Sequence, residues 1–296
     1  MLSILIPTYN YPISNLLKSL DKVTIGFDYE ILCCEDGSKL YIDENKTVCH
    51  STKNTTYLYS KENKGRITSR KFLAEKAKYD WLLFLDADVA ITNDNFINDY
   101  YSKYFTGEYD AIYGGCSYDL NRPDDSQVLR WKYGKTYEEV EAKTRNKSPY
   151  KFIVSANFLI KKETFFNLIS KINGDGYGYD LLLGALMKSD NTKVFHVDNP
   201  VIHKGLDKNS VFIDKVEKAV ETNYKLFNDN KINSTENSLL ETFKTIKKIG
   251  LIRPISSIYK LSRSRILKQL MSNNPNMKIL QFYKLGYLCH LSANTK

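Results

Sequence analysis

The feature that most constrains the fold is a run of large apolar residues that stops abruptly at two carboxylates. Trp81-Leu82-Leu83-Phe84-Leu85 leads directly into Asp86-Ala87-Asp88. A short, continuous apolar run predicts a buried strand, and ligands of open α/β sheets bind beyond the carboxyl ends of such strands. Two carboxylates this close repel each other unless a cation lies between them. The pattern favours a divalent metal that carries a phosphate, although a strand that ends in a solvated turn fits the same residues.

The surrounding sequence alternates between strand and helix. Strand-like runs at Leu2–Ile6, Tyr29–Cys34 and Thr55–Tyr59 are separated or followed by helical stretches at Ser14–Leu20 and Ile67–Lys78. This rhythm predicts a doubly wound, mostly parallel α/β sheet flanked by helices. Further strands are predicted at Phe152–Ile160 and Val194–Val197, with a helix at Leu181–Lys188 between them. From Val211 onward the pattern is helical, so the expected division is 1–210 and 211–296.

Composition places the chain among globular proteins of the cell interior. Hydrophobic residues make up 42% of the 296 residues, which is enough for a sizeable core. No apolar run approaches the roughly 20 residues needed to span a bilayer, and the first residues lack the features of a signal peptide. A cytoplasmic protein is therefore expected.

The net charge of +9 is concentrated at the carboxyl end. Residues 241–296 hold eleven lysines and arginines against one acid, Glu241, a net charge of +10 that leaves residues 1–240 at about −1. Interleaved isoleucines and leucines make this segment amphipathic, which is typical of helices that lie on an anionic membrane surface. An apolar face that packs on the rest of the protein is the alternative. No nucleic-acid partner is expected, because no binding motif accompanies the charge.

Several motifs, in order and at the right spacing over roughly residues 1–210, resemble those of family 2 glycosyltransferases with the GT-A fold. They are Ser3-Ile4-Leu5-Ile6-Pro7-Thr8-Tyr9-Asn10, Glu35-Asp36-Gly37-Ser38, Asn63-Lys64-Gly65-Arg66 with Arg70, Leu83-Phe84-Leu85-Asp86-Ala87-Asp88, Gly176-Tyr177-Gly178-Tyr179-Asp180 and Pro200-Val201-Ile202-His203. The resemblance implies a nucleotide-sugar-binding half at 1–110, an acceptor-binding half at 111–210 and a basic helical extension at 211–296.

The resemblance also implies residues that hold the nucleotide sugar. The predicted contacts are Pro7, Thr8, Tyr9, Asn10, Glu35, Asp36, Arg66, Arg70, Asp86 and Ala87. Glu35 replaces a more usual aspartate and is longer by one methylene. Arg66 and Arg70 share a face of the predicted helix, where guanidinium groups suit phosphate or carboxylate partners.

The implied metal is Mn²⁺ or Mg²⁺, with Asp86, Asp88 and His203 as candidate ligands. Asp180 is the predicted catalytic base, and Asp175 in the same glycine-rich loop is the reserve candidate. The family usually carries an acidic pair at this point, whereas this chain has Tyr179-Asp180. One carboxylate suffices for general-base catalysis if it reaches the acceptor hydroxyl.

The expected function is metal-dependent, inverting transfer of a sugar from a nucleoside diphosphate, UDP favoured, to a saccharide or glycolipid in cell-surface polysaccharide assembly. The rival expectation is a catalytically degenerate binding protein on the same fold that docks to a membrane or a partner. Tyr179 at the usual acidic position is the feature that favours the rival. The tail extends the localisation to the inner face of the cell membrane, as a peripheral protein.

Overall fold

The computed structural model describes residues 1–24, 26–104, 106–174, 176–234 and 237–294. By its internal contacts the chain divides into two units, each built from several chain segments. The first comprises Met1–Asp119, Glu138–Gly176 and Leu186–Gly205, and the second comprises Leu120–Tyr137, Tyr177–Ala185 and Leu206–Lys296. Segments 120–137 and 177–185, which the sequence interpretation assigned to the acceptor half, thus group with the C-terminal helices. The predicted domain boundaries themselves stay a prediction.

The first unit is built on a seven-stranded sheet with the order β3-β2-β1-β4-β8-β6-β9. Its strands are β1 (Leu2–Thr8), β2 (Tyr29–Asp36), β3 (Thr55–Ser60), β4 (Trp81–Leu85), β6 (Ala111–Tyr113), β8 (Asn157–Lys161) and β9 (Val194–His196). Only β8 runs antiparallel to its neighbours among these strands. The predicted mostly parallel sheet is confirmed, and the predicted strand at 152–160 is shorter, beginning at Asn157.

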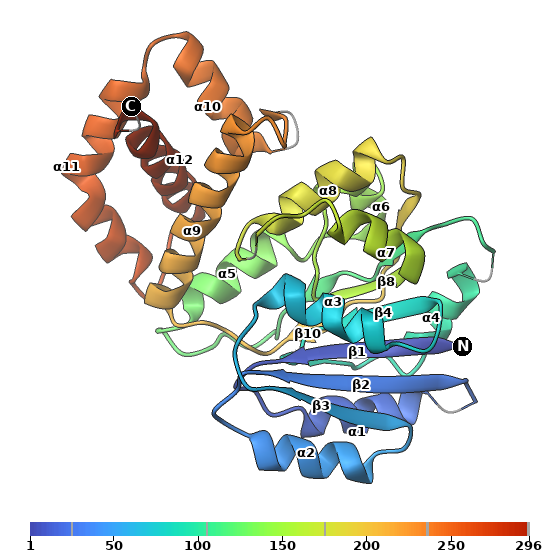
Figure 1. The fold of residues 1–296 in the computed structure, drawn as a ribbon. Helices are drawn as coiled ribbons and strands as arrows, with labels where there is room; N and C mark the ends of the chain where they lie inside the picture. Colours follow the sequence, from blue (N-terminus) through green and yellow to red (C-terminus); the bar gives the residue numbers. More distant parts are fainter. Residues whose placement is uncertain (25, 105, 175, 235–236, 295–296) are drawn as a thin grey trace. The chain divides into compact units, whose positions relative to one another are not determined.

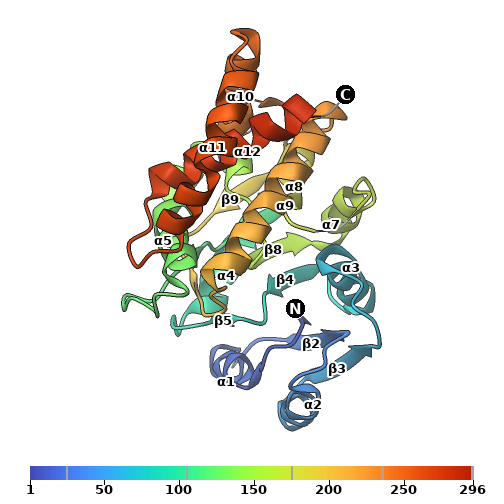
Figure 2. The same ribbon diagram turned by 90° about the vertical axis from the view of Figure 1, so that its left-hand side faces the viewer.

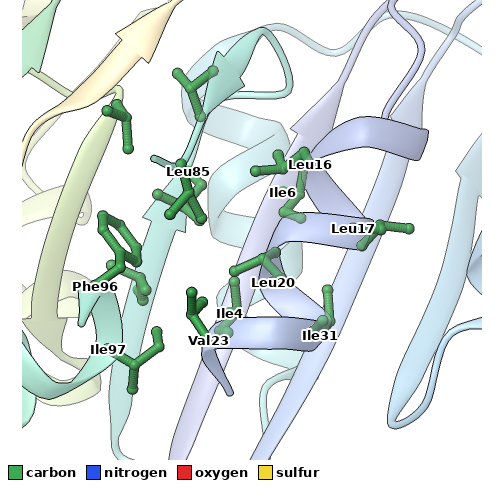
Figure 3. Close-up of a cluster of buried hydrophobic side chains, with 14 of the residues drawn as sticks. Ile4, Ile6, Leu16, Leu17, Leu20, Val23, Ile31, Leu85, Phe96 and Ile97 are labelled. Atoms are coloured by element: carbon green, nitrogen blue, oxygen red, sulfur yellow. The ribbon is translucent and has the colours of Figure 1, made fainter. Parts of the chain in front are cut away.

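Helices cover both faces of this sheet (Figure 1). They are α1 (Ser14–Val23), α2 (Ile42–Ser51), α3 (Arg66–Lys76), α4 (Phe96–Tyr104), α6 (Ala142–Arg145), the 3-10 turn η1 (Pro149–Lys151) and α7 (Lys162–Ile169). The apolar stripe of α1 lies against alternate residues of the strands, so that one face of the sheet is closed (Figure 3). The labelled residues Leu16, Leu17, Leu20 and Val23 of α1 belong to one buried cluster with Ile4 and Ile6 of β1 and Ile31 of β2.

A second, three-stranded sheet lies in the same unit with the order β5-β10-β7. Its strands are β5 (Val89–Ala90), β7 (Cys116–Ser117) and β10 (Val201–His203). The approach to β10 is fixed by Asn199, whose backbone N–H donates to Gly114 O at 3.1 Å and whose side chain donates to Phe96 O at 2.8 Å. This small sheet places the residues that follow β4 next to the residues that follow β9.

The second unit is helical (Figure 2). It contains α5 (Val128–Tyr137), the first turns of α8 (Tyr179–Ser189), α9 (Asn209–Asn228), α10 (Ser238–Lys248), α11 (Ile252–Leu270) and α12 (Met277–Asn294). Its core joins Leu129 of α5 to Phe212 of α9, Tyr259 of α11 and Leu280 of α12. The phenol groups of α12 also donate hydrogen bonds to glutamates of α9, in the pairs Tyr283–Glu217 and Tyr287–Glu221. The predicted helical C-terminal region is confirmed.

Candidate active site

The carboxyl ends of β1, β2 and β4 meet at one edge of the large sheet. β1 pairs with β2 and with β4 in parallel, so Asn10, Gly37 and Asp86 each follow a neighbouring strand at that edge. Pro7 lies inside β1, which extends to Thr8, two residues beyond the strand-like run predicted at Leu2–Ile6. Its missing N–H is tolerated because the pairing of β1 with β4 extends only from Ser3 to Leu5.

The loops after β1 and β2 are fastened to each other by Asn10. Its side-chain Oδ1 accepts hydrogen bonds from the N–H groups of Lys39 and Leu40, at 2.7 and 3.0 Å. Its own N–H donates to Ser38 Oγ at 2.9 Å. Asn10 adopts the left-handed conformation, with φ at 51°, which asparagine tolerates better than most residues. Tyr9, between the buried Thr8 and Asn10, is left exposed.

Glu35 and Asp36, at the end of β2, make hydrogen bonds within the protein. Glu35 is fully buried and its Oε1 accepts a hydrogen bond from Asn45 Nδ2 at 2.6 Å. The two oxygens of Asp36 accept the backbone N–H groups of Lys64 and Gly65, at 2.9 and 3.0 Å. Asp36 therefore ties the start of α3 to β2. Gly37 permits this close approach, because a Cβ there would lie 2.2 Å from Asn63 N.

Asp86 is the meeting point of the two predicted arginines. Arg66 Nη2 donates to Asp86 Oδ2 at 3.1 Å, and Arg70 Nη2 donates to Asp86 Oδ1 at 2.5 Å. Arg70 also donates to Ser155 O, at 3.2 Å. One helical turn separates the arginines at the start of α3, which is why both reach the same carboxylate.

Asp88 is brought to His203 by the pairing of β5 with β10. His203 pairs with Val89, and Lys204 N donates to Asp88 O at 2.8 Å. His203 Nε2 then lies 3.5 Å from Asp88 Oδ2. Gly205 closes over the same carboxylate, since a Cβ there would lie 2.0 Å from Asp88 Oδ2.

The electrostatics at Asp88 fit a cation site. Burial raises the pKa of Asp88 above its ordinary value; the attraction of His203 lowers it in part, and repulsion from Asp86 raises it further. His203 Nδ1 is buried without a hydrogen-bond partner among the described residues. A carboxylate oxygen and an imidazole nitrogen are both metal donors, and their separation lets one ion contact both.

Protein ligands alone do not complete such a site. Within the described ranges no group of three or more histidine, cysteine, aspartate or glutamate side chains gathers closely enough to hold a metal ion. Mg²⁺ and similar ions commonly take one or two carboxylates and fill their shell with phosphate oxygens and water. Asp88 and His203 are therefore the ligands that the arrangement offers, and Asp86 has both oxygens engaged by arginine.

Three further residues at this site were not predicted from the sequence. Burial raises the pKa of Tyr11, and the negative charge of Asp88 raises it further, so the phenol lies near that carboxylate. The ring of Tyr118 contacts His203, with a centroid separation of 5.7 Å. Gly205 is the third. The available signals were the nearness of Tyr11 to the Thr8-Tyr9-Asn10 segment and of Gly205 to His203.

The predicted catalytic base lies in the second unit. Asp180 is exposed in the first turn of α8, after Gly178, where a φ of +97° strains any other residue and a Cβ would lie 3.1 Å from Ala219 O. The neighbouring Tyr177 ring lies 5.1 Å from Lys215 Nζ of α9. Asp175, the reserve candidate, lies outside the described residues. The assignment of the base stays a prediction.

Comparison with known proteins gives a family match over more than half of the chain. Residues 3–166 match the family model described as glycosyl transferase family 2. A curated relative from Haemophilus influenzae, described as an uncharacterized glycosyltransferase, is 34% identical over 90 residues. That match covers 30% of this chain and 29% of the relative, so the chain spans under a third of its length.

Solved structures share the fold at low identity. A mannosyltransferase from Pyrobaculum calidifontis, in complex with GDP-Man and Mn²⁺, is 12% identical with a TM-score of 0.58, covering 99% of this chain and 85% of that one. Glucosyl-3-phosphoglycerate synthase from Mycobacterium tuberculosis, with Mg²⁺ and UDP, is 14% identical with a TM-score of 0.51, covering 74% and 75%. TarS of S. aureus is 15% identical with a TM-score of 0.50, covering 74% and 39%.

Proposed function

The chain belongs to glycosyltransferase family 2, and from this premise we propose that it is a metal-dependent, inverting glycosyltransferase. It takes a sugar from a nucleoside diphosphate, with UDP favoured by the family resemblance, and transfers it to a saccharide or glycolipid acceptor in cell-surface polysaccharide assembly. The observation that carries the proposal is the pair Asp88 and His203, 3.5 Å apart beside the arginine-held Asp86.

The proposed donor site uses the edge formed by β1, β2 and β4. Tyr9 and the fastened loops after β1 and β2 face the nucleoside, and Arg66 supplies positive charge near the diphosphate. Arg66 is the more available of the two arginines, because its side chain is 44% exposed and that of Arg70 is 8% exposed. Arg70 instead positions Asp86 for the ribose or a water molecule. Glu35 and Asp36 act through the shape of the loops that they hold.

The proposed chemistry is a direct displacement at the anomeric carbon. Asp180 accepts the proton of the acceptor hydroxyl as its oxygen attacks. Asp88 and His203 hold Mn²⁺ or Mg²⁺, and when bound this ion supplies Lewis-acid stabilisation of the diphosphate. Arg66 adds a donor to the negative charge that develops there. A single inversion of configuration follows, because no second nucleophile is proposed.

The proposed setting is the cytoplasmic face of the cell membrane, with residues 241–296 in contact with anionic lipid. The support is the charge of +10 in this segment. In the part of the chain that the structure describes, no helix is long and apolar enough to cross a bilayer.

A degenerate, non-catalytic binding protein is the second candidate. Tyr179 stands where the family usually has the first acid of a pair, and this observation alone favours it. Such a protein would bind a sugar nucleotide with metal but would not turn it over.

The test measures turnover of a panel of UDP- and GDP-sugars. Turnover is monitored as nucleotide release in the presence of Mn²⁺, Mg²⁺ or a chelator. Asp88→Asn keeps the shape of the side chain but removes the ligand charge, so it should lose metal-dependent binding and turnover together. Asp180→Asn should keep nucleotide-sugar affinity and lose on the order of 10²–10⁴-fold in rate, as expected for loss of a general base. Wild-type rates in Asp88→Asn would refute the metal site, and binding without turnover of any sugar would support the second candidate.

A further inference from the structure

The amphipathic pattern of residues 241–296 is mostly explained by packing inside the second unit. Tyr259, Ile266 and Leu270 of α11 and Met277, Leu280 and Tyr283 of α12 belong to one buried cluster with α5 and α9. α11 packs along α12 in both views (Figures 1 and 2). These residues form the core of their own unit and are not available to a membrane.

A second set of apolar residues, on α11 and at the corner before it, remains outside that core. Ile258 is 54% exposed and Leu261 is 87% exposed, although both are large aliphatic residues. Ile249 and Leu251, at the corner between α10 and α11, are also exposed. Single exposed leucines are ordinary on protein surfaces, so the arrangement of these four residues decides whether they form a surface.

Helical geometry gathers part of this set on one face. Pro254, Ile258, Leu261, Arg265 and Lys268 follow each other at intervals of four, three, four and three residues, and all are exposed. Residues at these intervals share a face of an α-helix. The buried residues Tyr259, Ile266 and Leu270 occupy the opposite side. We call these five exposed residues the α11 outer face: its amino-terminal half is apolar and its carboxyl-terminal half is basic.

The corner that precedes α11 is a fixed turn. Gly250 has φ at +76°, its N–H donates to Lys247 O at 3.2 Å, and the N–H of Leu251 donates to Ile246 O at 3.1 Å. This is the Schellman pattern that ends a helix with glycine in the left-handed conformation. The turn leaves Ile249, which precedes Gly250, and Leu251, which follows it, exposed.

Positive charge surrounds both apolar groups. Lys247 and Lys248 precede the corner, Arg253 follows it, and Lys260 lies on α11 two residues after Ile258; all four are exposed. No acidic residue occurs from position 242 to the end of the chain. A second copy of this chain is a poor occupant, because two such surfaces repel each other.

We propose that the α11 outer face and the corner Ile249–Leu251 form a docking surface for an anionic lipid bilayer. Ile258 and Leu261 enter the interface between headgroups and acyl chains, and the lysines and arginines contact the lipid phosphates. The inference rests on the proposed peripheral location and narrows it to particular residues. Lipid fits better than nucleic acid, because the exposed side chains between the charges are aliphatic, whereas single-stranded nucleic acids are held by aromatic stacking.

The experiment is flotation of the full-length protein with two kinds of vesicle, phosphatidylcholine alone and an equimolar mixture with phosphatidylglycerol. The wild-type protein should float with the anionic vesicles and be released in part by high salt, since screening acts over about 8 Å at physiological ionic strength. Ile258→Ser with Leu261→Ser should weaken binding by roughly tenfold or more, because aliphatic burial is lost. The matched control is Leu120→Ser, because Leu120 is 89% exposed in the same unit but outside this surface.

Charge is tested in the same way. Arg253→Gln, Lys260→Gln and Arg265→Gln together should weaken binding by roughly fivefold for each residue removed. The control is the same loss of charge on or just beyond α9, with Lys218→Gln, Lys225→Gln and Lys231→Gln. Equal losses of vesicle binding in the two triple variants would mean that only net charge matters. That result would overturn the proposed surface.

Other outcomes also decide the matter. Equal flotation with both kinds of vesicle, or unchanged flotation of the Ile258 and Leu261 variant, would overturn the proposal. The proposal would also be overturned if the same residues affected single-stranded oligonucleotide binding, or self-association measured by sedimentation, more strongly than they affect vesicle binding. Asp88→Asn should float like the wild-type protein, and the α11 variants should release nucleotide normally without vesicles, so failure here is distinct from failure of the proposed function.

Discussion

Arg66 and Arg70 contact the same carboxylate from different environments. Arg70 is held in the interior, where it bridges Asp86 and Ser155 O, whereas Arg66 reaches Asp86 from the solvent side. A charge pair gains little at a surface, where water screens it, but removing one partner of a buried pair leaves an uncompensated charge.

This difference predicts unequal losses of stability. Arg70→Gln should lower the free energy of unfolding by about 3 kcal/mol or more. Arg66→Gln, the matched control, should cost less than about 1 kcal/mol and should instead weaken nucleotide binding. Guanidinium chloride unfolding of both variants, with nucleotide titration, measures the two effects. Equal unfolding costs would mean that Arg70 does not position Asp86 in the way described.

His196 illustrates a residue whose charge state is set by the fold. Its Nδ1 accepts a hydrogen bond from Arg145 Nη1 at 2.9 Å, so its Nε2 carries the proton that is donated to Pro149 O, also at 2.9 Å. The pKa of His196 is lowered from 6.5 to about 4, chiefly by burial and in smaller part by the charge of Arg145. Below pH 6.5 the unfolded chain binds a proton here that the folded chain does not bind.

Stability should therefore fall as the pH drops from 6.5 toward 4, with the full contribution present above 6.5. The expected loss is roughly 3 kcal/mol across that window. Comparison of unfolding at about pH 7.5 and about pH 5 should show a smaller change in His196→Gln than in the wild-type protein. His50→Gln, which removes an exposed histidine, serves as the control and should leave the pH dependence of unfolding as in the wild-type protein. An identical pH dependence in His196→Gln would exclude this histidine as the cause.

At the scale of elements, two very short strands do most to assemble the site. β5 has two residues and β10 has three, yet their pairing sets Asp88 against His203. Strands this short show no alternation, so the hydrophobic pattern did not indicate their pairing, and only the family resemblance grouped Asp88 with His203 as candidate metal ligands. Gly205 completes the approach, because any side chain there would displace Asp88.

Gly205→Ala should therefore disturb the proposed metal site more than the fold. Its Cβ would also lie 2.7 Å from Asp88 Cβ, so the whole aspartate side chain must move. The concentration of Mn²⁺ needed for nucleotide binding should rise by roughly tenfold or more, the range seen when a metal ligand loses its support. Gly26→Ala, where a Cβ meets nothing within 4 Å, tests backbone strain alone. Calorimetric titration of Mn²⁺ with nucleotide would contradict the idea if both variants behaved alike.

Element prediction from the sequence succeeded where apolar periodicity was strong and failed where burial is polar. The strands β1 to β4 and the helices α1 and α3 were predicted close to their observed bounds. α2 was not predicted, because it docks through the buried Asn45, which accepts from Ile13 N and donates to Glu35. Arg145 of α6 is likewise buried, and it donates to backbone carbonyls of Tyr113, Gly114 and Val197. A polar residue satisfied in this way has no signature in a hydrophobic pattern.

At the scale of the whole molecule, the GT-A type fold and the family were predictable, and the grouping of segments was not. The motifs of the first unit that resemble those of the family are local, and each follows one strand. The second unit instead depends on a core cluster built from distant segments, which includes Leu129, Tyr259 and Leu280. A single sequence carries no direct sign of such pairings. For the same reason, the sequence could not separate the apolar residues of the tail that pack from those that stay exposed.

The discontinuous second unit has a consequence for synthesis on the ribosome. α5 is made early, but the side chains that cover Leu129 come from α9, α11 and α12, up to residue 283. At typical elongation rates this delay is roughly ten to thirty seconds, during which an apolar surface of the nascent chain is unprotected. A chaperone that shields α5 until translation ends would suit this order of events. Stalling near residue 240 should be more damaging than its distance from the sequence motifs of the first unit suggests.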